Sequence, residues 1–432
     1  MPATSTPALP RALPPDSLAQ SLLLAACAVT HVIGGRSLAD VELVPAGTLP
    51  ATRASTQDLV YGTLRRFGAG DAVLARLLQK PLAAEEIRAL LLCALYRLET
   101  RPEASHTVVD QAVEAAGSLA GGNFRGLVNG VLRNYLRQRA SLDSLKSAAQ
   151  GGEAGLWHPA WWLARLRRAY PDAWQGLVAA GNGQPPMALR VNRRRTDRNA
   201  YLQRLAEAGI DARPVGEDGL LLATPLPVDR LPGFADGLVS VQDPGAQRAA
   251  LLLDAADGQR VLDACAAPGG KTAHLLERAS LHLTALDLAP ARTRRIEENL
   301  GRLGLRADIR TADCTVPETW WDGRPFDRIL ADVPCTASGV VRRHPDSKWL
   351  RQEKDIQRFA RTQRRILDAL WPALAPGGKL LYATCSVFPE ENGKQIAAFL
   401  AAVPQAALLA EEQWLPQDEH DGFYYALLQK AA

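Results

Sequence analysis

The sequence lacks the features that mark several common protein classes. No two of its six cysteines, at positions 27, 93, 265, 314, 335 and 385, have the CxxC spacing of zinc sites, and no histidine cluster accompanies them. Six cysteines among 432 residues are also too few for the disulfide scaffold of a small secreted domain. We therefore expect a cytoplasmic protein whose cysteines are reduced and which needs no metal.

Signals for export or membrane insertion are lacking as well. The first 17 residues are rich in proline and do not have the basic start and apolar run of a signal peptide. The apolar segment at residues 21–33 is too short to cross a bilayer, and we find no internal repeat. We expect no membrane role.

The composition is that of a folded protein with a localised positive charge. Hydrophobic residues make up 47% of the chain, which is ample for packed cores, and 432 residues indicate two or three domains. The net charge is only +4, but residues 157–215 contain ten arginines against four acidic residues. A basic segment of this kind is a better sign of nucleic-acid binding than a uniform excess of charge.

The first third of the chain is predicted to be helical. Apolar residues recur at spacings of three to four, and strand-like alternation is nearly missing. The segments with this spacing are residues 17–33, 55–67, 83–98, 105–119 and 123–138. They predict an all-α domain over residues 1–145. The small, polar and Gly-rich residues 141–155 indicate a linker.

A small basic domain of mixed α and β structure is predicted over residues 146–237. All ten arginines of the basic segment lie in it. Its periodicities predict helices at residues 160–170 and 199–208 and strands at residues 187–192 and 212–215.

Residues 238–432 predict a Rossmann-like, doubly wound α/β domain. Short apolar runs alternate with helical patterns, which is typical of a mostly parallel sheet with helices on both faces. The runs are residues 260–264, 281–287, 307–312, 327–333 and 379–383, and helices are expected at 244–256, 270–279, 290–303, 353–375 and 392–402. Ligands of such sheets bind beyond the carboxyl ends of the strands, near the point where the strand order reverses.

The first apolar run leads into the motif VLDACAAPGGKT, residues 261–272. Gly269 and Gly270 allow the backbone to approach a ligand closely, and the N-terminus of the following helix offers free N–H groups. The motif is not a P-loop, because Cys265 stands where the first glycine would be, and it is not GxGxxG. Taken alone, a Gly-Gly turn of this kind is more often a tight turn without a ligand.

Acidic residues and cysteines follow the next strands. Asp287 and Asp313 end the second and third strands, where a carboxylate can accept hydrogen bonds from ribose hydroxyls or meet an adenine amino group. Viewed alone, Asp287 is equally well explained as a helix N-cap. Asp332 and Cys335 follow the fourth strand, and Cys385 follows the fifth. In a parallel sheet these ends converge on one cleft, but their placement does not rank the two cysteines.

Together these motifs resemble the NOL1/NOP2/Sun family of RNA 5-methylcytosine methyltransferases. The family's signature is matched by Pro334-Cys335, Thr384-Cys385-Ser386 and Ala267-Pro268-Gly269-Gly270-Lys271. The likeness covers nearly the whole chain, including a stretch at residues 123–133 that resembles the RNA-binding NusB fold, and matches at 158–171 and 421–424. Residues 243–247 match too, although Ala246 stands where the family usually has serine.

The resemblance implies roles for four side chains. Cys385 would be the nucleophile that adds to C6 of a cytosine, and Cys335 would assist release of the product. Asp332 would hydrogen-bond N3 of the ring and stabilise charge as the adduct forms, while Lys271 would orient the base or polarise that carboxylate.

The resemblance also implies a cofactor and a partner. The methyl donor would be S-adenosylmethionine, with no metal, in a pocket lined by Cys265, Ala266, Ala267, Pro268, Gly269, Gly270, Lys271, Asp287, Asp313 and Asp332. Bacterial family members that modify small-subunit (16S) ribosomal RNA are the most similar. The expected partner is therefore 16S ribosomal RNA, naked or in an assembling subunit, and the chain is expected to be a monomer.

A basic platform is expected to hold the RNA phosphates. The candidates are Arg190, Arg193, Arg194, Arg195 and Arg198. The local excess of positive charge favours RNA contact over the plain alternative, a solvated charged surface.

Two other functions fit part of the sequence. A DNA cytosine-5 methyltransferase would use Cys335 as its nucleophile, but the Thr-Cys-Ser motif and the NusB-like domain are arguments against it. A ribosome-assembly or antitermination factor with an inactive methyltransferase domain would bind RNA without catalysis. The intact set of Asp332, Cys335, Cys385 and the Gly-rich loop disfavours that alternative.

Overall fold

The computed structural model describes residues 13–151 and 158–432, without the side chains of 143–151. The chain divides into two compact units. One comprises Met1–Gly183 with His344–Gln352, and the other comprises Gln184–Arg343 with Glu353–Ala432. Each unit is described below by itself.

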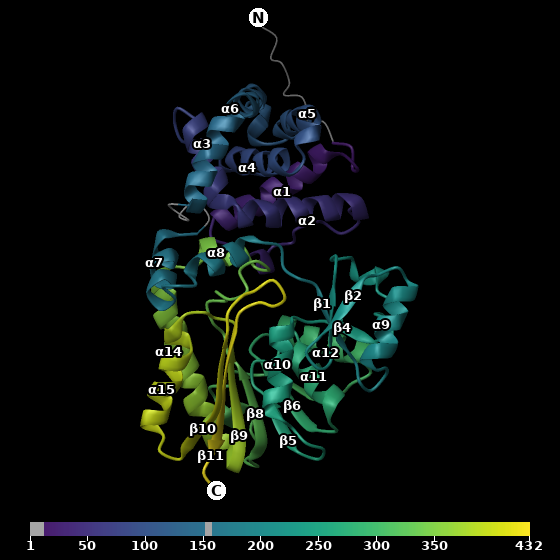
Figure 1. Cartoon of the computed structure of the whole chain (residues 1–432), viewed down its shortest axis with the longest axis vertical. Coiled ribbons are helices and arrows are strands. Elements are labelled where there is room, and N and C mark those ends of the chain that lie inside the picture. The colour runs from purple at the N-terminus through teal and green to yellow at the C-terminus, as the bar shows by residue number, and fades with distance from the viewer. Residues whose placement is uncertain (1–12, 152–157) are drawn as a thin grey trace, which may run out of the picture. The chain divides into compact units, whose positions relative to one another are not determined.

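The N-terminal unit is built from helices, as its periodicity predicts (Figure 1). They are α1 (Leu18–Ile33), α2 (Pro50–Arg65), α3 (Phe67–Leu77), α4 (Glu85–Thr100), α5 (Ser105–Ala116), α6 (Arg125–Gly151), α7 (Ala160–Ala169), α8 (Trp174–Asn182) and α13 (Ser347–Leu350). Helix α4 packs against α1, α2, α3, α5 and α6, and its residues 89–96 are all buried. A helix that is apolar on nearly every side must lie at the centre of a bundle, and α4 does.

The predicted linker is wrong in its first part. Residues 141–151 continue α6, whose last residue is Gly151, and the remainder of the predicted linker, 152–155, lies outside the described residues. The sequence SLDSLKSAAQ contains leucine, lysine, alanine and glutamine, which are good helix formers, so its polarity alone was misleading.

Residues 344–352 belong to the N-terminal unit although the residues before and after them in the sequence belong to the other unit. Trp349 donates a hydrogen bond from Nε1 to the carbonyl of Leu64 (2.8 Å). The buried Lys348 donates to the carbonyl of Arg65 (3.1 Å), and burial lowers the pKa of its ammonium group to about 7. This segment is therefore held by buried polar contacts within the helical unit.

The second unit begins with a small antiparallel sheet in the order β2-β3-β1-β4. Its strands are β1 (Ala188–Val191), β2 (Ala212–Val215), β3 (Gly219–Leu222) and β4 (Val239–Val241), and α9 (Arg198–Glu207) packs on them through Tyr201 and Leu205. The mixed α and β structure predicted for this segment is confirmed.

The large sheet has the order β10-β11-β9-β8-β5-β6-β7. Its strands are β5 (Arg260–Asp263), β6 (His282–Asp287), β7 (Asp308–Thr311), β8 (Phe326–Asp332), β9 (Leu374–Thr384), β10 (Ala406–Trp414) and β11 (Phe423–Lys430). Strands β7, β6, β5, β8 and β9 pair in parallel, and only β11 runs against its neighbours β9 and β10. The predicted doubly wound, mostly parallel sheet is confirmed, and its order reverses between β5 and β8.

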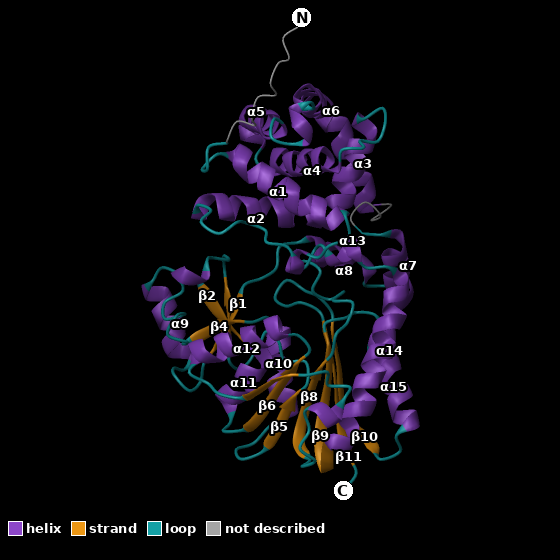
Figure 2. Cartoon of the chain, turned by 180° about the vertical axis from the view of Figure 1, so that it is seen from behind, coloured by secondary structure: helices purple, strands orange, loops and turns teal. Residues whose placement is uncertain are grey.

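Helices cover both faces of this sheet (Figures 1 and 2). The helices α14 (Glu353–Leu370) and α15 (Gly393–Ala402) pack on one face, and α10 (Pro244–Leu253), α11 (Gly270–Arg278) and α12 (Pro290–Leu303) pack on the other. Strand β9 serves both cores, because Leu380 and Tyr382 face the first group of helices while Leu381 and Ala383 face the second.

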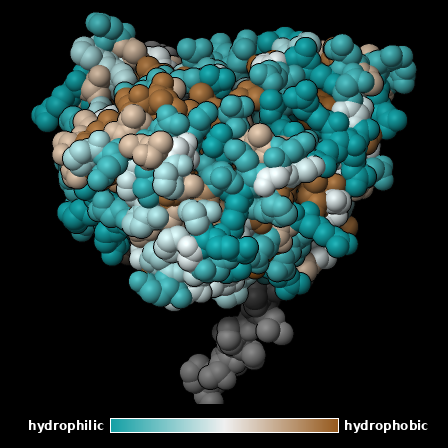
Figure 3. Space-filling view, turned by 90° about the horizontal axis from the view of Figure 1, so that it is seen from below, coloured by the Kyte–Doolittle hydropathy of each residue, from teal (hydrophilic) through white to brown (hydrophobic). Residues whose placement is uncertain are grey.

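Polar residues dominate the visible exterior. Figure 3 shows one face of the molecule on which hydrophilic residues predominate, with apolar residues in smaller groups between them. Within the part of the chain that the structure describes, no helix combines the length and apolar character needed to cross a membrane.

Candidate active site

The carboxyl ends of five parallel strands carry the candidate residues. Strand β5 leads into the Gly-rich loop, β6 ends at Asp287, β7 precedes Asp313, β8 ends at Asp332, and β9 ends directly before Cys385. Asp332 pairs with Ala383 in the register of β8 and β9, so the loops that carry the two cysteines start side by side. The convergence expected of a parallel sheet is thus present at its switch point.

The Gly-rich loop turns tightly before α11. Gly269 has a φ of 93°, in the left-handed region, and its N–H bonds the carbonyl of Ala266 (2.7 Å). A Cβ at this position would lie 3.2 Å from Cα of Ile296, on the neighbouring helix α12. Glycine is therefore favoured at this position both by its left-handed backbone conformation and by the close approach of α12.

Asp287 joins the second strand to this loop. Its carboxylate accepts a hydrogen bond from the N–H of Ala267 (3.0 Å) and another from the N–H of Leu288 (2.9 Å), and it is only 5% exposed. Asp313 instead is exposed and accepts from the N–H and hydroxyl of Thr315 in its own loop. Of the acidic residues proposed for the cofactor pocket, Asp287 contacts the Gly-rich loop and Asp313 contacts only its own loop through these bonds.

Asp263, at the end of β5, was not proposed from the sequence. It is fully buried, and its Oδ2 accepts a hydrogen bond from the hydroxyl of Thr272 (2.7 Å), while its Oδ1 has no hydrogen-bond partner among the described residues. Burial raises the pKa of this carboxyl to about 7, and the nearby charge of Asp332 raises it further against the opposing effects of Thr272 and Lys271. A buried acceptor without a partner beside the Gly-rich loop fits a site for a polar cofactor.

Lys271, in the first turn of α11, and Asp332, the last residue of β8, form an ion pair at the switch point. The Nζ–Oδ2 distance is 2.6 Å, and both side chains are partly buried. Burial lowers the pKa of Lys271, but the negative charges of Asp332, Cys385 and Asp263 outweigh burial and raise it overall. Lys271 thus remains a cation close to both the carboxylate and Cys385.

The two cysteines that follow β8 and β9 meet. Their Sγ atoms are 3.3 Å apart, within hydrogen-bond range for sulfur. The hydrogen bond with Cys385 raises the pKa of the Cys335 thiol well above its usual range, and burial acts in the same direction. Cys335 is buried and Cys385 is partly exposed. The arrangement therefore favours a neutral Cys335 thiol beside a more accessible Cys385.

The loop of Cys335 is hydrogen-bonded both to Cys385 and to the segment before β11. The N–H of Gly339 donates to the carbonyl of Cys385 (2.8 Å), and the N–H of Gly422 donates to the carbonyl of Gly339 (2.9 Å). A Cβ on Gly339 would lie 2.4 Å from the carbonyl oxygen of Gly422, so only glycine permits this approach. The adjacent Asp421 is fully buried and pairs with Arg342 and Arg343.

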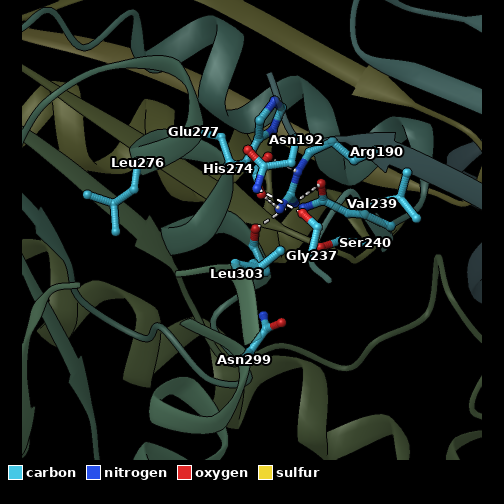
Figure 4. Close-up of polar contacts among 12 residues, drawn as sticks. Arg190, Asn192, Gly237, Val239, Ser240, His274, Leu276, Glu277, Asn299 and Leu303 are labelled. Atoms are coloured by element: carbon cyan, nitrogen blue, oxygen red, sulfur yellow. Dashed lines mark hydrogen bonds and ion pairs between the residues drawn. The ribbon is translucent and has the colours of Figure 1, made fainter. Parts of the chain in front are cut away.

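The basic platform proposed from the sequence has a different environment from the one expected. Arg190 is fully buried and forms two hydrogen bonds of 2.7 Å with the carboxylate of Glu277, as Figure 4 shows. It also donates to the carbonyl of Gly270 (2.8 Å), in the Gly-rich loop. A guanidinium group without solvent exposure cannot reach an RNA phosphate, so Arg190 is not retained as an RNA contact.

The other four arginines are bonded to the ends of helices or turns. Arg194 donates to the carbonyls of Leu276 and Ala279 at the end of α11, and Arg195 to that of Leu303 at the end of α12. Arg198 donates to the carbonyls of residues 216 and 217. Arg193 has a side chain that is 52% exposed and pairs with Asp218 at 3.5 Å. Cations at helix C-termini stabilise the helix dipole, so Arg194 and Arg195 have a structural role whether or not they bind RNA.

The fold and this site define an S-adenosylmethionine-dependent methyltransferase. Three features are typical of this class: the order of the sheet, the Gly-rich loop after β5, and the acidic residue at the end of β6. The family model of the 16S rRNA methyltransferase RsmB/F matches residues 250–429. Models of the ferredoxin-like domain of such methyltransferases and of the NusB family match residues 158–229 and 36–137, each within one of the three predicted domains. The boundaries between those domains stay predictions.

The similar proteins extend over most of the chain. The ribosomal RNA small subunit methyltransferase B of Vibrio vulnificus is 46% identical over 395 residues, covering 89% of this chain and 92% of the relative. The crystal structure of PH0851 aligns with 98% of this chain and 100% of its own, with a TM-score of 0.78 and 22% identity. A methyltransferase homologue from Pyrococcus horikoshii aligns with 62% of this chain and 93% of its own, with a TM-score of 0.56 and 28% identity. The chain therefore belongs to the RsmB/F family of 16S rRNA methyltransferases, whose methyl donor is S-adenosylmethionine.

Proposed function

We propose that this methyltransferase acts on C5 of a specific cytosine in 16S ribosomal RNA through a covalent bond between Cys385 and C6. The observation that carries the proposal is the pair of thiols 3.3 Å apart, with the Lys271–Asp332 ion pair beside them. Two cysteines and an acid–base pair at the cofactor end of the sheet suit a carbon nucleophile better than transfer to an exposed nitrogen or oxygen, which needs no thiol.

The first step makes C5 nucleophilic. C5 of cytosine attacks poorly by itself, but a thiolate that adds to C6 forms an S–C6 bond and turns C5 into an enamine-like carbon. The electron pair of the C5–C6 double bond moves toward N3. Cys385 is the better candidate for this thiolate because it is partly exposed and has the cationic Lys271 near it, whereas the Cys335 thiol is buried with a raised pKa.

Asp332 and Lys271 stabilise the charge that develops in the ring. A protonated carboxyl group at the end of β8 would donate a hydrogen bond to N3 and pass its proton to the ring as negative charge develops there. The ammonium group of Lys271, 2.6 Å away, would then stabilise the carboxylate that is left. S-adenosylmethionine supplies an activated methyl group, which C5 accepts when the sulfonium carbon–sulfur bond breaks. Residues of the Gly-rich loop, Asp287 and Asp263 would hold the cofactor, while Asp313 would contribute from the neighbouring loop.

Release requires removal of the C5 proton and cleavage of the S–C6 bond. The C5 proton passes to a solvent water molecule, the electron pair of the C5–H bond re-forms the C5–C6 double bond, and Cys385 leaves as a thiolate. The neutral thiol of Cys335 stands 3.3 Å from the departing sulfur and can donate a hydrogen bond to it. Cys335 thereby assists release without being the attacking group.

Trapping with RNA that carries 5-fluorocytosine at the target position tests the proposal. Fluorine at C5 cannot leave as a proton does, so the adduct should accumulate as a species that resists denaturing gel electrophoresis when S-adenosylmethionine is present. Cys385→Ala should abolish the adduct, and Cys335→Ala should retain it. If Cys335→Ala abolished the adduct and Cys385→Ala kept it, the nucleophile would be Cys335, as in a DNA cytosine-5 methyltransferase.

The remaining alternative is an RNA-binding factor with an inactive catalytic domain. Calorimetric measurement of S-adenosylmethionine binding distinguishes it from an active methyltransferase. The purified chain should bind S-adenosylmethionine, and bisulfite sequencing of 16S rRNA from a strain without the gene should reveal one unmethylated cytosine. A chain that binds RNA but no cofactor would favour the inactive factor.

A further inference from the structure

Glu391 lies between the two cysteine loops and is absent from the mechanism described above. It follows β9 in the sequence SVFPEEN and is fully buried. Burial raises the pKa of its carboxyl group, although the hydrogen bonds from Ser386 and Thr336 oppose that effect. A buried carboxylate is unfavourable for stability unless it is well hydrogen-bonded, so its partners indicate what it does.

The partners of Glu391 are the residues that directly follow each cysteine. Thr336, the neighbour of Cys335, donates to Oε1 from its N–H (2.9 Å) and to Oε2 from its hydroxyl (2.5 Å). Ser386, the neighbour of Cys385, donates to Oε2 from its hydroxyl (2.6 Å). One carboxylate therefore bonds both loops, each at the position next to the sulfur-bearing residue.

Further bonds fix the carboxylate itself. Gln363 of α14 donates from Nε2 to Oε1 of Glu391 (3.1 Å) and to the carbonyl of Pro334 (3.0 Å), the residue before Cys335. The hydroxyl of Tyr382 donates to the main-chain carbonyl of Glu391 (2.6 Å). The four residues that donate these hydrogen bonds to Glu391 are all buried, so solvent does not compete for the bonds; they are Thr336, Gln363, Tyr382 and Ser386.

We propose that Glu391 is a positioning residue that sets the separation of the Cys335 and Cys385 sulfurs. The proposal rests on the two-cysteine mechanism above for its catalytic meaning, but its structural content is independent of that mechanism. The hydrogen bonds of the Glu391 carboxylate among the described residues go to neither sulfur, although its negative charge contributes to the raised pKa of Cys335. Glu391 acts by reach, because its side chain is long enough to bond the residues after both cysteines at once.

Two substitutions separate reach from charge. Glu391→Gln removes the charge but keeps the length: its amide oxygen can accept at the Oε1 position, and its NH2 group can donate to the two hydroxyls at the Oε2 position. Glu391→Asp keeps the charge but is one methylene shorter, so it cannot bond both loops. We expect Glu391→Gln to retain a kcat near that of the wild type and Glu391→Asp to lose about 100-fold, as a misplacement of order 1 Å does. The KM values for RNA and S-adenosylmethionine should stay unchanged in both variants.

The separation of the sulfurs can be measured without methylation. Brief treatment of the full chain with diamide should oxidise Cys335 and Cys385 to a disulfide, quantified by mass spectrometry of the linked peptides. The rate should be unchanged in Glu391→Gln and lower in Glu391→Asp. Ser386→Ala and Thr336→Val each remove one hydroxyl contact with Glu391 and should give intermediate linkage rates. They test the proposal if Glu391→Asp does not fold. The control is Glu412→Ala on β10, which breaks a partly buried pair with Arg248 of α10 and should change neither the linkage rate nor kcat.

The outcomes distinguish the two proposals. If wild-type protein forms no 5-fluorocytosine adduct but linkage slows in Glu391→Asp, the covalent mechanism fails and the positioning role stands. If the adduct forms and linkage is equally fast in wild type and Glu391→Asp, the positioning role is wrong. A Glu391→Gln variant that is as impaired as Glu391→Asp would also overturn it, because the charge rather than the reach would then matter.

Discussion

Arg190 and Glu277 form an ion pair that is closed to solvent on both sides. The side chains are 0% and 1% exposed, and two parallel hydrogen bonds of 2.7 Å join them. Arg190 comes from β1 of the small sheet and Glu277 from α11, the helix that follows the Gly-rich loop. The Nη1 atom of Arg190 donates hydrogen bonds to the carbonyl of Gly270 and to the side-chain oxygen of Gln242. Arg190 therefore joins the small sheet to both ends of α11, to Gly270 at its start and to Glu277 near its end.

Removing one partner of this pair should destabilise the protein strongly. Arg190→Leu or Glu277→Leu leaves an uncompensated buried charge, which typically costs about 3–5 kcal/mol in the free energy of unfolding. The double substitution Arg190→Leu with Glu277→Leu should recover much of the loss, since no charge is then stranded. Urea denaturation of the four proteins gives the coupling energy. Single variants as stable as wild type would show that the pair contributes little.

Arg190 also shows why the sequence predicts the fold better than it predicts the surroundings of individual side chains. The strand endings at Asp287 and Asp332 follow from apolar periodicity and agree with β6 and β8. Whether an arginine is exposed depends on a carboxylate 87 residues away, and no local pattern in the sequence carries that information. Strand β10 was also missed. Its side chains are exposed or only partly buried, and its short apolar run, residues 406–410, is followed at once by the polar residues 411–413.

Arg193 should be the member of the arginine cluster that binds RNA, because its guanidinium group pairs with the side chain of an aspartate, whereas those of Arg194 and Arg195, which are also exposed, bond the ends of helices. Arg193 has a side chain that is 52% exposed and only a 3.5 Å contact with Asp218. Arg193→Gln should weaken RNA binding and reduce the slope of log affinity against log salt concentration by about one, the value for one phosphate contact. Its melting temperature and its affinity for S-adenosylmethionine should be unchanged.

Arg194→Gln is the matched comparison, because it removes the same charge from the next position. Its guanidinium group bonds the carbonyls that end α11, so its melting temperature should fall. Filter binding across a salt series and thermal denaturation measure the two effects. If wild type and Arg193→Gln had equal salt slopes, Arg193 would not contact an RNA phosphate, and the arginine cluster would have a structural role alone.

The catalytic centre was partly accessible from sequence. Cys335, Cys385 and Asp332 follow successive parallel strands, so their convergence was predictable from topology, and the sulfurs do meet. Topology could not rank the two cysteines, since the difference in their exposure arises from packing. Glu391 was missed because a glutamate in the sequence PEEN is usually a solvated surface residue, and only the folded structure buries it against Thr336 and Ser386.

Asp263 should give the protein a distinct dependence of stability on pH. Its pKa rises from an ordinary 3.8 to about 7 in the folded chain, mainly because of burial. The folded state therefore binds more protons than the unfolded state between pH 4 and 7, and the free energy of unfolding from this group falls as pH rises through that window and levels off above it. Asp263→Asn keeps a hydrogen-bonding partner for Thr272 and removes the titration, so the stability of wild type relative to this variant should decline from pH 4 to pH 7. Urea denaturation at intervals of half a pH unit measures the difference, with Asp327→Asn, at the opposite end of the adjacent strand β8, as the control. A difference between wild type and Asp263→Asn that stays constant across the window would mean that Asp263 ionises as an ordinary carboxyl group does.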